Sequence, residues 1–317
     1  MSISAIVPVW NGRELLVRLF DSLDRQTLRA DEVLAIDNGS TDGADQVACS
    51  RGARVIAMGR NAGFAAAVNR GLQEARGEWI AVLNSDVELA RDYFAILIGA
   101  NEPFATGKIL SPKGTLDATF DLTARGGVTW RAGNGMADGP PFDLPRTIFS
   151  APWTALVVRR SVFERTGFLD ESFESYLEDA DFGLRCASRA IAGRYVPDAR
   201  AVHVGSASLG SWHPETVRRI ARNQLFVAAR HREAGRFWPS LVAQVLWGAV
   251  AVRHGAGLAW LRGKWEGLRR FSAIRRDAPD GDAALVRDAL RNNEQFIREH
   301  SHDTYWRLYF LLTRGAK

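Results

Sequence analysis

The first hundred residues alternate short apolar runs with amphipathic segments, and this alternation limits the folds that the chain can adopt. Four runs predict strands and two segments predict helices: the strands are Ile3–Val9, Glu32–Ile36, Arg54–Met58 and Trp79–Leu83, and the helices are Glu14–Gln26 and Ala62–Ala75. Strands that alternate with helices build a mostly parallel sheet, so we expect a doubly wound α/β domain. The polar residues after each strand should meet in one crevice, where such sheets bind ligands.

The pattern changes along the rest of the chain. Residues 103–150 are rich in Gly, Pro and Asp and give no clear assignment. Ala155–Arg160 and Tyr195–Val204 predict further strands, and only helical patterns follow. We therefore expect an α/β domain over residues 1–213 and a helical region over residues 214–317.

Two common nucleotide-binding signatures are absent from the sequence. The first predicted strand leads into Pro8-Val9-Trp10-Asn11-Gly12 instead of Gly-x-Gly-x-x-Gly, and no Gly-x-x-x-x-Gly-Lys-Ser/Thr loop occurs. These absences disfavour a dinucleotide-dependent dehydrogenase and a P-loop nucleotidase. A nucleotide-binding α/β domain without such loops needs carboxylates at its strand ends together with a metal ion.

Cysteine usage and hydropathy favour the cytoplasm. Cys49 and Cys186 match no metal-ligand or redox spacing, so we expect two buried thiols in a reducing compartment. Met1–Trp10 lacks the features of a signal peptide. The longest later apolar run, Leu241–Val252, contains Gln244 and is shorter than the ~20 residues that span a bilayer. We expect no transmembrane helix.

Seven collinear stretches together resemble the inverting family 2 glycosyltransferases, which have the GT-A fold. They lie between Ser4 and Gly210: Ala5 to Gly12, Ser22 to Gln26, Ile36 to Gly43, Asn61 to Gly71, Leu83 to Val87, Glu178 to Arg185 and His203 to Gly205. Each alone is weak evidence, but their order and spacing fit the family throughout. The Asn61 and Leu83 stretches are most similar to the rhamnosyltransferase-like branch.

The resemblance implies substrates and a cofactor. Members of that branch build bacterial surface polysaccharides, and they transfer a sugar from a deoxythymidine or uridine diphosphate (dTDP or UDP) donor to a lipid-linked or saccharide acceptor. L-Rhamnose is the sugar that the branch suggests. The family also implies a divalent cation, Mg²⁺ or Mn²⁺, which neutralises the leaving diphosphate.

Residues at two strand ends correspond to the family's metal site. Asn84-Ser85-Asp86 occupies the position of the family's Asp-x-Asp motif, so Asp86 would bind the metal, and Asn84 and Ser85 would face the donor. His203 stands where relatives place a second metal ligand. From the residues alone, an Asx turn and a structural histidine are the alternatives.

The resemblance also implies the nucleotide-binding residues. They are Pro8, Trp10, Asn11, Asp37, Asn38, Asn61, Gly63 and Asn69. Asp37 would accept a hydrogen bond from the base, although many relatives also carry Asp at the position of Asn38, and Trp10 offers a ring for stacking. Helix capping is the alternative for Asp37, and packing of a small-residue helix is the alternative for Asn69.

Acids at the start of a predicted helix correspond to the family's catalytic base. By resemblance, Asp179 would take the proton of the acceptor hydroxyl, and Glu178 would orient the acceptor. Neighbouring acids should raise the pKa of Asp179. Asp181 lies one turn from Arg185 and suggests a structural pair. Trp153 is a candidate for stacking against the acceptor sugar, where relatives often carry smaller residues.

The C-terminal region is strongly basic. Residues 218–317 carry 19 Lys and Arg against 9 Asp and Glu, whereas residues 1–217 carry 22 against 27. Phe237–Arg276 contains four tryptophans and a single acid, a composition typical of helices on an anionic membrane surface. A helical cap on the transferase core is the alternative, and Ala283–His300 offers a surface for a homo-oligomer. Nucleic acid is disfavoured because no nucleic-acid motif accompanies the basic residues.

The sequence therefore favours a metal-dependent inverting glycosyltransferase in the cytoplasm, peripheral on the inner membrane. Two alternatives stay open. One is a sugar-nucleotide pyrophosphorylase, which has a related sheet. The other is a membrane-associated assembly protein that keeps the fold without catalysis.

Overall fold

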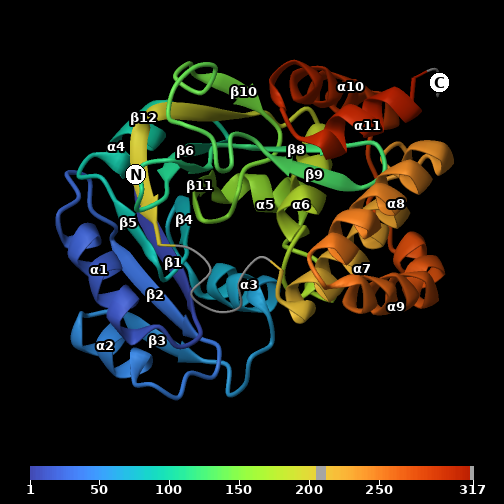
Figure 1. The fold of residues 1–317 in the computed structure, drawn as a ribbon. Helices are drawn as coiled ribbons and strands as arrows, with labels where there is room; N and C mark the ends of the chain where they lie inside the picture. The colour runs from blue at the N-terminus through green and yellow to red at the C-terminus, as the bar shows by residue number, and fades with distance from the viewer. Residues whose placement is uncertain (205–211, 315–317) are drawn as a thin grey trace. The chain divides into compact units, whose positions relative to one another are not determined.

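The computed structural model describes residues 1–204 and 212–314, which belong to two compact units. Of these residues, unit 1 contains 1–120, 133–174 and 191–204, and unit 2 contains 121–132, 175–190 and 212–314. Figure 1 labels the elements of both. Unit 2 thus takes two short segments from within the sequence of unit 1.

Four parallel strands form one half of the sheet in unit 1, in the order β4-β1-β2-β3. They are β1 (Ile3–Val9), β2 (Glu32–Asp37), β3 (Arg54–Ala57) and β4 (Trp79–Leu83). The register sets Asp37 beside both Val9 and Ala57, so β1, β2 and β3 end at one edge of the sheet. The parallel arrangement predicted from the sequence is confirmed.

Six further strands extend the sheet beyond β4. They are β5 (Val87–Leu89), β6 (Phe104–Leu110), β7 (Leu116–Ala118), β10 (Arg146–Ile148), β11 (Ala155–Arg159) and β12 (Gly193–His203). β11 is antiparallel to both β4 and β6, whereas β12 is parallel to β6. β5 pairs antiparallel with β12, and β7 with β6. Segment 103–150 therefore adds strands to the sheet, two of them only three residues long.

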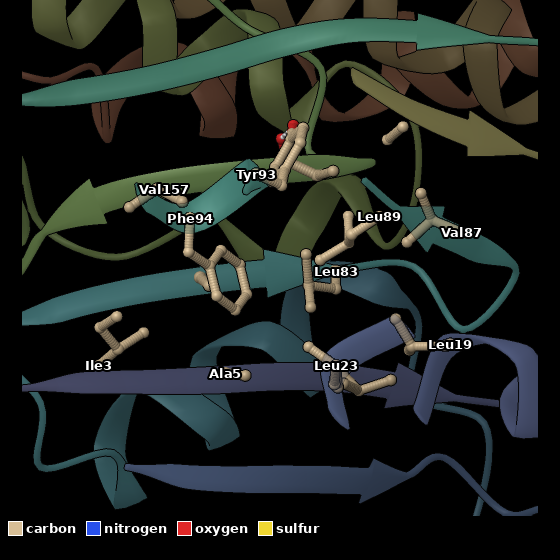
Figure 2. Close-up of a cluster of buried hydrophobic side chains, with 14 of the residues drawn as sticks. Ile3, Ala5, Leu19, Leu23, Leu83, Val87, Leu89, Tyr93, Phe94 and Val157 are labelled. Atoms are coloured by element: carbon tan, nitrogen blue, oxygen red, sulfur yellow. Dashed lines mark hydrogen bonds between the residues drawn. The ribbon is translucent and has the colours of Figure 1, made fainter. Parts of the chain in front are cut away.

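Helices pack on both faces of this sheet. They are α1 (Arg13–Asp24), α2 (Ala44–Ser50), α3 (Phe64–Glu74), α4 (Tyr93–Gly99), α5 (Arg160–Thr166) and the 3₁₀ turn η1 (Glu171–Phe173). Alternate residues of β1 point to opposite faces. Ala5 joins the core that contains Leu23 of α1 and Phe94 of α4, as Figure 2 shows. Ile6 faces Gly71 of α3, where a Cβ atom would approach Ile6 to 2.3 Å.

The two thiols differ in exposure. Cys186 is buried, but Cys49 is exposed, so the expectation of two buried thiols was wrong. Helix α2 buries Ala44 and Ala48, which lie one turn apart. Cys49 follows Ala48 and so points to the solvent side of the helix.

Unit 2 combines a hairpin with six helices. The hairpin consists of β8 (Asp121–Ala124) and β9 (Val128–Arg131), and the helices are α6 (Glu178–Ala187), α7 (Pro214–Arg230), α8 (Phe237–Arg253), α9 (Gly257–Arg276), α10 (Ala283–His300) and α11 (Thr304–Leu312). Arg125, in the hairpin turn, forms a 2.7 Å salt bridge with Glu294 of α10. Within the described ranges, no helix is both long and apolar enough to cross a membrane.

Candidate active site

Asp37 and Asn38 end β2 and have different roles in the structure. Asn38 is buried, and its side chain accepts a hydrogen bond from the N–H of Ala62 (2.8 Å) and donates one to the carbonyl of Gly63 (3.2 Å). Asp37 is partly exposed, and one of its oxygens accepts from the N–H of Ser40 (2.9 Å). The side chain of Asn38 is thus occupied by hydrogen bonds between two loops. Of the pair, Asp37 is the more accessible for a hydrogen bond to a nucleotide base.

The loop after β3 is held close to the backbone of Glu174. Gly63 has a φ of 93°, and a Cβ atom there would lie 2.7 Å from the carbonyl oxygen of Glu174. The same oxygen accepts from the N–H of Ala65 (2.9 Å), and Asn61 accepts from the N–H of Gly63 (3.0 Å). The close approach of Glu174 leaves no room for a Cβ atom and explains why residue 63 is a glycine. The predicted nucleotide contacts of Asn61 and Gly63 stay a prediction.

Trp10 directly follows β1, and the residue is 40% exposed. Pro8 precedes it within the strand, and Asn11 follows it in a left-handed conformation (φ 60°). The Asn11 side chain accepts from the N–H of Thr41 (2.9 Å), which fixes the turn after Trp10. An exposed aromatic ring beside the strand end of Asp37 is a geometry that can stack on a base.

Asn69 of α3 is buried. Its amide donates to the carbonyl of Leu169 (2.9 Å) and to Glu171 (3.0 Å), and its oxygen accepts from the N–H of Leu169 (3.0 Å). The side chain therefore joins α3 to the segment before η1. This geometry favours the packing alternative over a donor contact.

A histidine lies between two carboxylates in unit 1. The antiparallel pairing of β5 with β12 sets Val87 opposite His203, so Asp86, which precedes Val87, lies beside the ring. Asp86 Oδ1 is 3.1 Å from His203 Nε2, and Asp117 Oδ2 of β7 is 2.9 Å from Nδ1. We call Asp86, Asp117 and His203 the histidine cluster.

The histidine cluster is arranged to hold positive charge. Burial alone would lower the pKa of His203, but hydrogen bonds to Asp117 and Asp86 outweigh it and raise this pKa to about 9. At neutral pH the imidazolium donates to both carboxylates. The cluster thus concentrates a cation between two acids.

The donor set of the histidine cluster fits a divalent cation. If His203 Nε2 gives up its proton, this nitrogen and an Asp86 oxygen can both turn to an ion, and oxygen and imidazole ligands suit Mn²⁺. Asp117 holds the other ring nitrogen, as carboxylates do behind metal-binding histidines. Among the described residues, no three His, Cys, Asp or Glu side chains form a complete metal site. Further ligands would come from the donor diphosphate and water.

Asn84 and Ser85 connect β4 to Asp86. Both are partly exposed, and the N–H of Asn84 donates to the carbonyl of Thr154 (2.9 Å). That bond fixes the chain just before the histidine cluster. Donor contacts of the two side chains stay a prediction.

Three carboxyl groups and one arginine meet in unit 2. The β8–β9 register sets Asp121 opposite Arg131, with Asp121 Oδ1 3.6 Å from the arginine Nε. Asp121 also hydrogen-bonds Asp179 in the first turn of α6, where Glu178 precedes it. We call Asp121, Arg131, Glu178 and Asp179 the acid cluster. Asp121 and Glu178 are buried, whereas Asp179 is partly exposed.

The acid cluster contains three carboxyl groups and one arginine, and the pKa values of the carboxyl groups are raised. Burial raises the pKa of Asp121 to about 7, and the charge of Asp179 adds to this. Burial and Asp179 raise the pKa of Glu178 well above its ordinary range. Burial also raises the pKa of Asp179, but Arg131 and the hydrogen bond from Asp121 oppose the rise. Arg131 and the hydrogen bond from Asp121 thus limit the rise of the Asp179 pKa, in a cluster where burial raises the pKa of all three carboxyl groups.

Asp181 belongs to a separate ion-pair network. It is fully buried and accepts from Arg185 (3.0 Å), Arg230 (2.7 Å) and His231 (2.9 Å). Burial would raise the pKa of Asp181, but Arg185, His231 and Arg230 together hold it well below the ordinary range. The predicted pair with Arg185 is confirmed within α6, and the bond from Arg230 joins α6 to α7.

Trp153 is buried, and its ring packs edge-on against Phe163 at a centroid distance of 6.3 Å. A sugar stacks only on an accessible ring face. The structure therefore gives Trp153 a place in the core of unit 1, and acceptor stacking on it has no support in this geometry.

Sequence reasoning missed three members of these clusters. Asp117 lies in a three-residue strand, and Asp121 and Arg131 lie on a short hairpin in the unassigned segment. Neither of the two buried oxygens Asp121 Oδ2 and Glu178 Oε2 has a hydrogen-bond partner in the described part of the chain. The one signal in the sequence was the polar and charged content of an otherwise strand-like stretch, Leu116 to Arg131.

Comparisons with known proteins place this chain in a family. The model of glycosyl transferase family 2 matches residues 4–166, which is half of the chain. The chain therefore belongs to glycosyltransferase family 2. This bears out the resemblance and favours sugar transfer over a pyrophosphorylase.

Individual relatives sharpen the assignment. The chain is 29% identical over 273 residues to N-acetylglucosaminyl-diphospho-decaprenol L-rhamnosyltransferase of Mycobacterium tuberculosis, covering 75% of this chain and 87% of that protein. It is 32% identical over 207 residues to a PGL/p-HBAD biosynthesis glycosyltransferase of Mycobacterium bovis, covering 61% and 73%. These similarities support the rhamnosyltransferase-like branch.

A solved structure supports the fold. The crystal structure of GalNAc-T7 with UDP, GalNAc and Mn²⁺ superposes with a TM-score of 0.66 at 15% identity. The match covers 95% of this chain, and the chain spans 58% of the length of that structure. The GT-A fold predicted from the sequence is therefore confirmed.

Proposed function

We propose that this chain is a metal-dependent, inverting glycosyltransferase that moves a hexose, L-rhamnose in the first instance, from a nucleoside diphosphate to a lipid-linked acceptor in cell-envelope synthesis. The observation that carries the proposal is the histidine cluster at the end of β12. A diphosphate leaving group needs a cation, and this cluster supplies an oxygen and an imidazole for one. The similarity to a rhamnosyltransferase suggests the sugar and the lipid-linked acceptor.

Unit 1 binds the donor in this proposal. Asp37 accepts a hydrogen bond from the base, and Trp10 stacks on it. Asp86 and His203 hold Mg²⁺ or Mn²⁺, which when bound neutralises charge on the leaving diphosphate. Asp117 is a positioning residue that keeps the His203 ring in orientation.

Unit 2 supplies the base. As the acceptor oxygen forms its bond to the anomeric carbon, the bond from that carbon to the diphosphate breaks on the opposite face, and the leaving group takes the electron pair. The acceptor hydroxyl proton passes to the Asp179 carboxylate. Arg131 and the hydrogen bond from Asp121 favour the ionised form of Asp179, the form that can receive this proton, against the effect of burial.

A thermal-shift screen of nucleoside diphosphate sugars with Mn²⁺ or Mg²⁺ tests the proposal, because ligands that bind only the native state raise Tm. We expect dTDP-rhamnose with metal to stabilise the protein and to give an inverted product on a sugar linked to polyprenyl diphosphate. Stabilisation without transfer to any acceptor would instead support a non-catalytic assembly protein. Absence of any donor-dependent shift would contradict the proposal.

A further inference from the structure

The hairpin of α8 and α9 exposes an unusual amount of apolar side chain. Six large residues on it are between 54% and 77% exposed: Val245, Val252, Leu258, Leu261, Trp265 and Leu268. We call these six the hairpin apolar face. Scattered exposed leucines are ordinary on soluble proteins, but six on one pair of consecutive helices mark an interaction surface.

The four residues of this face on α9 form a stripe opposite the side on which the helix packs. In α9 the exposed positions Leu258, Leu261, Trp265 and Leu268 follow helical spacing. The opposite side carries Gly263, where a Cβ atom would lie 2.1 Å from the carbonyl of Arg218 in α7. The inward side of α9 is therefore in close contact with α7, and the apolar stripe is left for something outside the chain.

Helix α8 also packs closely against neighbouring parts of unit 2. Its Gly248 lies against the Trp260 ring of α9, where an added Cβ atom would approach the ring to 2.6 Å. Its Gln244 donates to the carbonyl of Gly126 (2.7 Å) and so uses another inward position. Val245 and Val252 lie one turn from Gly248 on either side, next to this contact, and are still 57% and 64% exposed.

The charged residues near the hairpin apolar face are almost all basic. Five exposed arginines lie on it or at its ends, and none forms a salt bridge within the described chain: Arg253, Arg262, Arg269, Arg275 and Arg276. The single acid of the hairpin helices, Glu266, is bound to Arg218 of α7. The surface thus combines apolar side chains with arginines that form no salt bridge in the described ranges.

We propose that the hairpin apolar face docks on an anionic lipid surface, with Leu258, Leu261 and Trp265 in the headgroup boundary and the arginines on acidic headgroups. A second copy of the chain is a poorer occupant, because a symmetric contact would set Arg262 and Arg269 of both copies against each other. Acidic lipid satisfies both parts of the surface at once. The proposal deepens the proposed function, since a lipid-linked acceptor lies in such a surface, but docking itself needs no turnover.

Vesicle co-sedimentation tests the docking. We expect the full chain to bind vesicles of phosphatidylcholine with about 30% phosphatidylglycerol and to bind vesicles of phosphatidylcholine alone at least about tenfold more weakly. The variant Leu261→Glu/Trp265→Glu should lose at least about tenfold in binding to the acidic vesicles. The matched control Leu144→Glu, at a 70% exposed position of unit 1, should bind as the parent does.

Charge is tested separately from apolar contact. Arg262→Gln/Arg269→Gln should weaken binding by about fivefold for each charge removed, and added salt should remove the difference. Equal binding of parent and Leu261→Glu/Trp265→Glu would overturn the proposal. So would a parent dimer in light scattering that this variant converts to monomer while vesicle binding is absent.

Both variants should keep the thermal shift given by the nucleoside diphosphate sugar with Mn²⁺. This readout separates the two proposals. Loss of vesicle binding with an intact donor shift supports docking alone, whereas vesicle binding without any donor shift would overturn the proposed function and leave the docking surface standing.

Discussion

The histidine cluster of unit 1 and the acid cluster of unit 2 use the same kinds of side chain with opposite results. In the first, two carboxylates share one histidine, and the pKa of His203 rises to about 9. In the second, three carboxyl groups share one arginine, and the pKa of Asp121 rises to about 7. The ratio of acids to bases and the depth of burial decide whether a cluster retains a cation or a proton.

This difference assigns separate work to the two clusters. A site whose two acids stabilise a cation is suited to a metal ion, which would take the place of the proton on His203 Nε2, and through it to a diphosphate. A site where buried carboxyl groups with raised pKa values lie beside a partly exposed carboxyl group is suited to proton transfer. The predictions below test that division.

The largest effect is expected from Asp179→Asn. An amide cannot accept the acceptor proton, so the transfer rate should fall by about a thousandfold. The initial rate with a nucleoside diphosphate sugar measures this. The conservative Asp170→Asn variant, at the cap of η1 in unit 1, serves as the control and should keep most of the activity. Unchanged turnover of Asp179→Asn would show that the acid cluster has no role in the reaction.

A smaller effect, on metal affinity, is expected from Asp117, which hydrogen-bonds His203. Asp117→Asn removes the carboxylate that orients His203, so Mn²⁺ affinity should fall by about ten- to a hundredfold. Calorimetric titration of Mn²⁺ measures the affinity, and the nitrogen couplings of bound Mn²⁺ in electron spin echo spectra report whether His203 is still a ligand. Asp143→Asn, an exposed acid bound to Lys108, is the matched control. Parent-like affinity in Asp117→Asn would mean that the histidine cluster serves packing.

The acid cluster should also make the stability of the folded chain depend on pH. Asp121 has a raised pKa, so the folded chain binds a proton that the unfolded chain releases above about pH 4. Its contribution to stability therefore falls as pH rises from there to about 7. Asp121→Asn should stabilise the protein at pH 8 by on the order of 2 kcal/mol, and by less at pH 5. Urea unfolding at the two pH values measures this, and equal effects at both would contradict the shifted pKa.

The smallest effect lies outside both clusters. Trp10→Ala should weaken nucleoside diphosphate binding by about 1 kcal/mol through loss of stacking, with little change in the rate at saturating donor. Trp10→Phe keeps an aromatic face and should recover most of the affinity. If the two variants bind equally poorly, the ring of Trp10 acts through something other than stacking.

The sequence predicted the parallel half of the sheet well, because buried parallel strands are continuous apolar runs such as Ile3–Val9 and Trp79–Leu83. Asp86 and His203 could be paired only through the family resemblance, since they are far apart in the chain. Their contact depends on the antiparallel register of β5 with β12, which no local pattern encodes.

The missing parts share a physical cause. β7 is three residues long, too short for a detectable period, so Asp117 had no assignment. Asp121 and Arg131 meet Asp179 through tertiary packing of a hairpin on a helix that begins more than forty residues later. Composition predicted a basic, Trp-bearing C-terminal region, but the outward stripe of α9 is known only once its inward contacts with α7 are seen.

The most direct test of the division between the clusters is one calorimetric titration of dTDP with Mn²⁺ into Asp86→Asn and Asp179→Asn, compared with the parent. The account predicts at least about a tenfold loss of affinity for Asp86→Asn, because the site would lose a carboxylate that could hold the cation needed by the diphosphate. It predicts affinity within about twofold of the parent for Asp179→Asn, because this carboxylate acts on the acceptor. Equal losses in both variants, or none in Asp86→Asn, would contradict it.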